Sequence, residues 1–124
     1  MAKQIRISES EWQVMELLWE KAPQLGSEIV NELAPRHDWS GNTVKTLLNR
    51  LVKKGALRFK EEGRAYLYRP AVPQEQCIRE ESRRFMDRVF GGSAAPLLMH
   101  FIEDAELSED EIKELKRLLD RKGK

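Results

Sequence analysis

The sequence predicts a mainly α-helical protein with one small β-wing, an α+β fold in two parts. Three observations lead to this expectation. Apolar residues recur at helical spacing through most of the chain, residues 56–68 read as two short strands, and two prolines within residues 70–73 break the pattern. We therefore expect a first domain over residues 1–73 and a helical region over residues 74–124.

The first two helices are predicted from their start signals. Ser8 and Glu11 form a capping-box pattern ahead of an apolar run, so a helix is expected over about residues 9–21, ending near Pro23. A second start signal follows at residues 25–27. The short helix that it opens is expected to stop at Pro35, since proline interrupts helical hydrogen bonding.

The third helix and the hairpin after it are the most strongly specified elements. Ser40 can cap the helix, apolar residues recur at positions 44, 47, 48, 51 and 52, and Gly55 stands where a left-handed C-cap is needed. Strands are expected over residues 56–60 and 64–68, joined by a turn at 61–63 in which Gly63 takes a positive φ. This order of elements matches a winged helix-turn-helix domain.

The outer face of the third helix is polar and basic. No Asp or Glu occurs between Asp38 and Glu61, whereas solvated helix faces usually mix Lys with Glu. Residues 36–69 hold nine basic and three acidic residues, although the whole chain holds 22 and 21. This charge distribution predicts a surface that meets the phosphates of double-stranded DNA. The predicted DNA-binding residues are Asn42, Thr43, Lys45, Thr46, Asn49, Arg50, Lys53, Lys54 and, at the hairpin tip, Arg64.

The C-terminal region predicts three amphipathic helices without a core of their own. They follow Pro73, the Gly91–Gly92–Ser93 break and a capping box of Ser108 with Glu111. Segments this short bury too little apolar surface to offset their ordering entropy, so we expect the same region of a second chain to cover them in a homodimer. The predicted dimerisation residues are Ile78, Phe85, Val89, Phe90, Leu97, Leu98, Phe101, Ile102, Ile112, Leu115, Leu118 and Leu119.

Other functional classes find little support. The single cysteine, Cys77, and the two histidines lack zinc-ligand spacing, so neither a metal site nor another cofactor is expected. No nucleophile arrangement, phosphate loop or carboxylate pair suggests an enzyme. The N-terminus has no secretory apolar segment and no run is long enough for membrane insertion, so we expect a cytoplasmic protein.

Several residues have a plain structural interpretation beside the functional one. We expect Trp12, Trp19 and Trp39 to pack in the core rather than stack on bases. Tyr66 and Tyr68 are also expected to pack. Cys77 is expected to be a buried thiol. The alternative function is a protein-interaction module, which the polar and basic stripe disfavours because interface cores are depleted in charge.

Four segments resemble the BlaI/MecI penicillinase-repressor family of bacterial transcriptional regulators. They are ISESEWQVMELLWE, WSGNTVKTLLNRLVKKGAL, EGRAYLYRP and the helical tail that ends near residue 120. The resemblance implies a homodimeric repressor on an inverted-repeat operator, with DNA contacts from the third helix and the wing. Members often carry Lys or Arg where this chain has Asn42.

The resemblance also implies a route of induction. In the β-lactam-sensing members, an Asn-Phe bond in the tail is cleaved, and the partner implied is a membrane metalloprotease sensor. The matching residues here are His100 and Phe101. For His100, a partly buried position in a dimer interface is the first expectation and a role at the scissile bond is the second.

Overall fold

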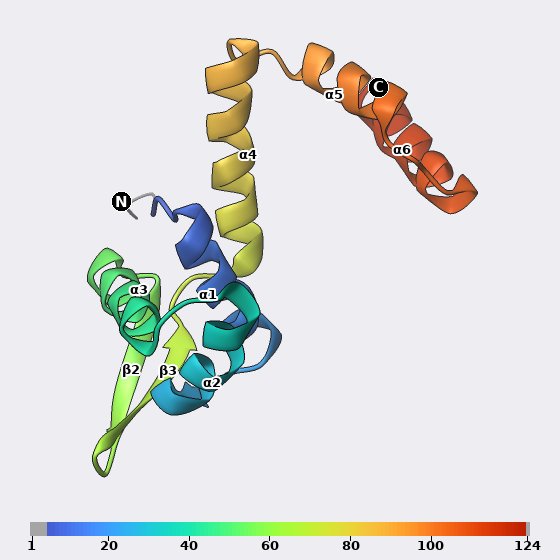
Figure 1. The fold of residues 1–124 in the computed structure, drawn as a ribbon. Helices are drawn as coiled ribbons and strands as arrows, with labels where there is room; N and C mark the ends of the chain where they lie inside the picture. The colour runs from blue at the N-terminus through green and yellow to red at the C-terminus, as the bar shows by residue number, and fades with distance from the viewer. Residues whose placement is uncertain (1–4, 124) are drawn as a thin grey trace. The chain divides into compact units, whose positions relative to one another are not determined.

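The computed structural model describes residues 5–123 and confirms a mainly α fold with a small β-wing (Figure 1). In chain order the elements are α1 (Glu9–Glu20), β1 (Gln24–Leu25), α2 (Gly26–His37), α3 (Gly41–Lys54), β2 (Leu57–Glu62), β3 (Ala65–Pro70), α4 (Gln74–Phe90), α5 (Ala94–Asp104) and α6 (Glu109–Lys122).

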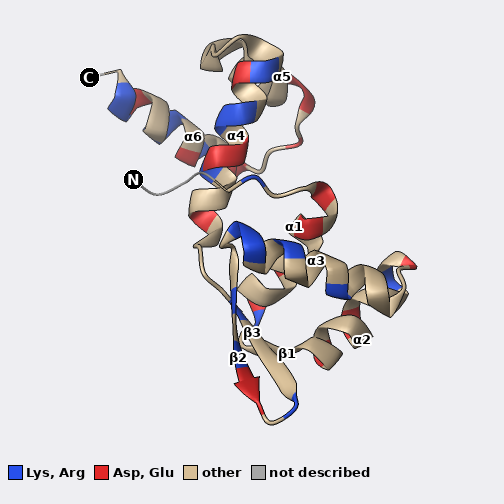
Figure 2. Ribbon diagram, turned by 90° about the vertical axis from the view of Figure 1, so that its left-hand side faces the viewer, with Lys and Arg blue, Asp and Glu red and all other residues tan. Residues whose placement is uncertain are grey.

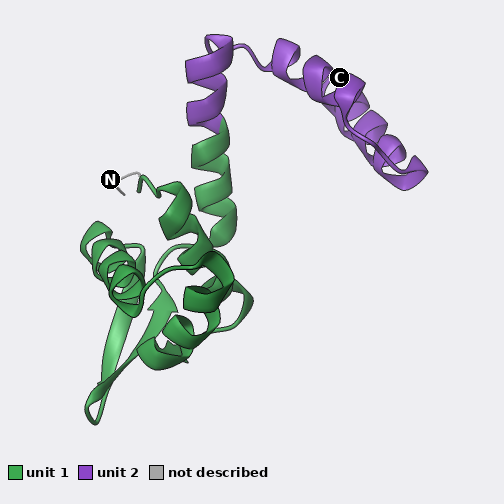
Figure 3. Ribbon diagram, in the orientation of Figure 1, with its two compact units in different colours: residues 1–82 green, residues 83–124 purple. Residues whose placement is uncertain are grey.

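Two compact units divide the chain, Met1–Ser82 and Arg83–Lys124 (Figure 3). The division falls inside α4, later than the predicted boundary after Pro73. Cys77, near the start of α4, is only 2% exposed and belongs to the hydrophobic core of the first unit. The first turns of α4 are therefore part of the first unit and not of the helical tail.

Local capping explains where the first helices begin and end. The Ser8 hydroxyl accepts from the Glu11 N–H at 3.2 Å, and the Glu11 carboxylate accepts from the Ser8 N–H at 2.8 Å, which confirms the predicted capping box. The predicted stop at Pro35 is wrong, because α2 continues to His37 and ends at Asp38 in the left-handed conformation. Pro35 has no backbone N–H to donate, but near the end of a helix this loss is tolerated. The helix end is held instead by the N–H groups of Asp38 and Trp39, which both bond to the Ala34 carbonyl.

The sheet has three antiparallel strands in the order β1-β3-β2. The predicted hairpin is present, with both strands shifted slightly toward the C-terminus and the turn at Gly63 and Arg64. Gly63 has the predicted positive φ, 64°. The short strand β1 was not predicted. It pairs Gln24 with Tyr68 and Leu25 with Leu67, and two residues are too few to show a strand period.

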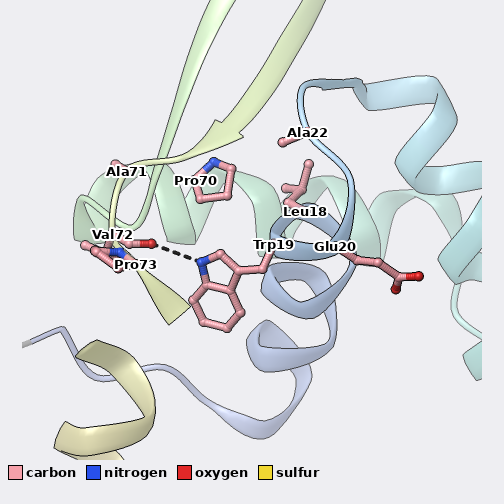
Figure 4. Close-up of a pocket in the computed structure, with 8 residues that line it drawn as sticks. All are labelled: Leu18, Trp19, Glu20, Ala22, Pro70, Ala71, Val72 and Pro73. Carbon is pink, nitrogen blue, oxygen red and sulfur yellow. Dashed lines mark hydrogen bonds between the residues drawn. The ribbon is translucent and has the colours of Figure 1, made fainter. Parts of the chain in front are cut away.

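The core of the first unit joins α1, α2 and α3 to the base of the wing. Its fully buried side chains include Met15, Leu18, Ile29, Leu33, Leu48, Leu51 and Leu57. All three tryptophans pack against this core, as predicted. Trp19 also donates from its indole N–H to the Val72 carbonyl at 3.0 Å, which ties α1 to the segment between β3 and α4 (Figure 4). Tyr68 is buried, whereas Tyr66 is exposed and meets Phe59 edge to face at 4.8 Å.

The second unit is helical but has no buried core. Between residues 83 and 123 every described residue is at least partly exposed within the single chain. The predicted Ser108–Glu111 capping box is present at the start of α6. Among residues 5–123 there is no helix with the length and apolar character that crossing a bilayer requires.

Candidate DNA interface

The exposed polar face of α3 is set by the burial of the opposite face. Val44, Leu47, Leu48 and Leu51 are buried, while Ser40 and Gly55 fix the helix ends. The Ser40 hydroxyl accepts from the Thr43 N–H at 3.1 Å, and Gly55 closes the helix with φ 85°. With these ends and this buried face fixed, the polar side chains of α3 project into solvent.

Seven predicted residues of α3 are exposed on the side opposite its buried face. We call them the α3 stripe: Asn42, Thr43, Lys45, Thr46, Asn49, Arg50 and Lys53. Figure 2 colours the Lys and Arg positions of this helix blue. The two threonine hydroxyls have local partners, since Thr46 donates to the Asn42 carbonyl at 2.9 Å and Thr43 shares a hydrogen bond with Ser40. Within residues 5–123 no carboxylate forms an ion pair with Lys45, Arg50 or Lys53. The stripe therefore presents polar side chains and positive charge that no acidic partner neutralises.

Arg64 lies apart from the stripe, at the turn of the wing, and is exposed. Because the turn residues Gly63 and Arg64 project beyond the strand pairs, the guanidinium stands at the end of the hairpin. This position would suit a contact to a phosphate beside a DNA groove if α3 entered that groove.

Lys54 has a different environment from the other predicted residues. Its ammonium donates to the Glu11 carboxylate at 2.5 Å and to the Arg6 carbonyl at 2.8 Å. The Glu11 side chain is 1% exposed and that of Lys54 is 37% exposed. Lys54 is thus held against α1 by a partner within the fold, and we place it outside the proposed DNA interface.

Glu11 is the residue that sequence reasoning missed at this site. Its capping-box role was recognised, but its second role, as the counter-ion of Lys54, depends on a contact across 43 positions. Burial alone would raise the pKa of the Glu11 carboxyl. The hydrogen bonds from Lys54 and Ser8 outweigh burial and hold the pKa below its usual 4.5.

This ion pair predicts a pH-dependent stability. A carboxyl with a lowered pKa in the folded state contributes stability above its unfolded pKa and loses it as the pH falls through the folded pKa. We expect Lys54→Met to cost about 1–3 kcal/mol at pH 7, because it leaves a buried carboxylate without its cation. The deficit should shrink in acid, once Glu11 is protonated. Urea unfolding at pH 7 and below pH 4 measures both values.

Lys53→Met is the matched control, since Lys53 is the adjacent exposed residue of the same helix. It should leave stability nearly unchanged at either pH. Equal losses in the two variants would show that the Glu11 contact does not stabilise the fold.

All the predicted dimerisation residues are at least partly exposed to solvent in the single chain. Ile78 lies in the part of α4 that belongs to the first unit, and the others lie in the second. Phe101 of α5 and Leu119 of α6 are 53% and 55% exposed. His100 is also largely exposed, with Nε2 3.3 Å from the Asp104 carboxylate, so the expected partial burial of His100 would need a second chain.

Comparison with known proteins identifies the family. The family model described as penicillinase repressor matches residues 7–121. The chain belongs to the penicillinase repressor family. It is 35% identical to the penicillinase repressor of Bacillus licheniformis, over 97% of this chain and 94% of that protein. It is 34% identical to the methicillin resistance regulatory protein MecI of Mammaliicoccus sciuri, over 97% and 98% of the two chains.

Two solved structures of the repressor BlaI are similar to part of this chain. The solution structure of the DNA-binding domain of the repressor BlaI is 37% identical, covers 61% of this chain and 93% of that one, and has a TM-score of 0.56. The Bacillus licheniformis BlaI monomeric form, solved in complex with the blaP half-operator, has the same identity and coverage and a TM-score of 0.54. The penicillinase repressor family consists of transcriptional repressors, which confirms the prediction of a DNA-binding regulator rather than an enzyme.

Proposed function

We propose that this chain acts in the cytoplasm as a homodimeric repressor on an inverted-repeat DNA operator. The observation that carries the proposal is the α3 stripe, which is exposed, polar and free of acidic residues. Asn, Thr and Arg side chains on a helix can read base edges in the major groove. The residues proposed to read bases are Asn42, Thr43, Lys45, Thr46, Asn49 and Arg50, whereas Lys53 and Arg64 neutralise phosphates.

A gel-shift screen of genomic fragments, challenged with heparin, tests this function directly. The protein should retain a small set of fragments that share an inverted repeat, because base contacts survive a competitor that displaces purely electrostatic binding. The alternative, a winged-helix module that binds proteins, predicts that no fragment is preferred. The charged stripe argues against that alternative, since interface cores are depleted in charge.

The second unit supports the homodimer. Its helices carry large apolar side chains that one chain leaves exposed, and no residue between 83 and 123 is buried. Water contact with this much apolar surface is unfavourable, and the simplest cover is the same surface of a second chain around a two-fold axis. Two-fold symmetry would also match two recognition helices to two half-sites about one turn of the duplex apart, roughly 34–36 Å.

Relief of repression is the third part of the proposal. We infer that a membrane metalloprotease sensor cuts the tail at the bond between His100 and Phe101, in α5. Both side chains are more than half exposed, and no residue of α5 is buried, so this helix can open locally at small cost. Intact-mass spectrometry of the repressor from induced cells tests the inference. A chain that stays whole while its target genes are expressed would contradict it.

A further inference from the structure

A cavity of about 580 Å³ lies between the end of α1 and residues 70–73, which join β3 to α4 (Figure 4). Its volume falls within the range of roughly 300–1,000 Å³ that is typical of small-molecule sites. All the residues that line it belong to the first unit, and none belongs to the α3 stripe or to the predicted dimerisation residues. Neither the proposed DNA interface nor the proposed dimer therefore uses this cavity.

An aromatic ring is fixed at one side of the cavity. Figure 4 shows the Trp19 indole between α1 and the segment of residues 70–73. The ring packs against the core, and its hydrogen bond of 3.0 Å to the Val72 carbonyl holds it in this orientation. Apolar side chains, among them Leu18, Pro70 and Val72, complete the wall. A flat apolar group can stack on an aromatic surface of this kind.

The hydrogen-bonding groups of the wall favour a ligand that carries its own donor. The indole N–H of Trp19 is committed to Val72, and the Ala71 N–H donates to the Ala56 carbonyl at 2.8 Å. Two of the lining residues are prolines, which have no N–H. A carbonyl oxygen has two lone pairs, so the Val72 carbonyl can accept a second hydrogen bond beside the indole.

Glu20 is the only charged residue among the eight that line the cavity. It is exposed, and it has no ion-pair partner within residues 5–123. Figure 4 shows its carboxylate turned away from Trp19. Because the side chain is exposed, rotation about its own bonds can bring the carboxylate to a ligand at the cavity edge. The charge at this edge therefore favours a cation.

The surface next to Glu20 adds to this preference. On its other side Glu20 lines a polar groove of about 330 Å³ together with Glu28, Glu32, Lys21 and Arg36. Three carboxylates thus stand against two cations, and Arg36 is already paired with Glu32. The excess of negative charge attracts cations to this part of the molecule and disfavours anions.

We propose that the cavity binds a small organic cation. Its flat apolar body stacks on Trp19, and its ammonium group donates to the Val72 carbonyl and meets the Glu20 carboxylate at the edge. The indole ring is also the aromatic side chain that attracts a cation most strongly. The inference is independent of DNA binding and of the dimer, because every residue that it uses lies in the first unit.

The test uses the full-length protein and three probes with the same phenyl body and different charge. Phenylethylammonium is a cation, phenylethanol is neutral and phenylpropionate is an anion. Heteronuclear NMR follows the indole N–H of Trp19 and the amide of Ala71. Phenylethylammonium should shift both signals saturably, with a Kd on the order of 1 mM for a ligand of this size. Phenylethanol should bind more weakly, and phenylpropionate should bind most weakly of the three.

Two variants locate the site, and each has a matched control. Glu20→Gln should weaken phenylethylammonium by about two- to fivefold, the range of an exposed ion pair, and leave phenylethanol unchanged. Ala22→Phe places a ring at the exposed cavity edge and should abolish binding, with thermal unfolding close to that of wild type. Glu9→Gln and Ala65→Phe make the same changes at exposed residues outside the cavity and should keep the wild-type Kd.

Three results would overturn the proposal. Equal affinity for the three probes would remove the preference for a cation. Absence of a saturable shift of the Trp19 signal, or unchanged binding in Ala22→Phe, would show that the cavity is not the binding site. Equal weakening by Glu9→Gln and Glu20→Gln would reduce the charge effect to a general attraction by the acidic surface.

Discussion

Replacing Phe101 and Leu119 with aspartate should turn the repressor into monomers and weaken its binding to a full operator by about a hundredfold or more. Both side chains are more than half exposed in the single chain, so neither substitution disturbs a buried side chain. A charge in the proposed dimer interface would instead be buried without a partner. Once the chains separate, each half-site is bound by an independent event, and the gain from linked binding disappears.

Sedimentation and operator titration measure this effect together. Affinity for an isolated half-site should stay at the wild-type value, because the α3 stripe is untouched. Glu103→Asp with Lys116→Asp is the matched control, since it changes exposed polar residues on the same two helices. A variant that remains dimeric with aspartate at both apolar positions would show that the second unit does not hold the dimer together.

Arg50→Ala should relax the sequence preference of the repressor. Arg50 is exposed in the middle of the α3 stripe and has no ion-pair partner among residues 5–123. If its guanidinium reads a guanine, its removal costs about 1–3 kcal/mol on the operator and much less on unrelated DNA. Competition titrations with operator and scrambled duplexes give this difference.

Arg36→Ala is a suitable control for the removal of one arginine. Arg36 lies on α2, where its guanidinium is paired with Glu32. This variant should retain the wild-type preference for the operator. Equal weakening of both duplexes by Arg50→Ala would assign Arg50 to a phosphate contact instead of a base.

Features that depend on neighbouring residues were predicted well from the sequence. The Ser8 and Ser40 caps, the Gly55 helix end and the positive φ of Gly63 all follow from hydrogen bonds or backbone sterics within a few positions. The polar stripe of α3 follows from helical periodicity alone. The stop at Pro35 failed because bonding beyond the proline compensates for the missing donor.

The helices, the wing and the basic face that we assign to DNA can therefore be derived from the order of the residues. The packed fold decides instead which charged side chains on that half of the chain are free to bind DNA. Packing pairs Lys54 with Glu11, buries Cys77 in the first unit, adds β1 to the sheet and sets Arg58 opposite Arg69. Each of these depends on how distant segments meet or on strand register, and no local pattern in the chain specifies such contacts.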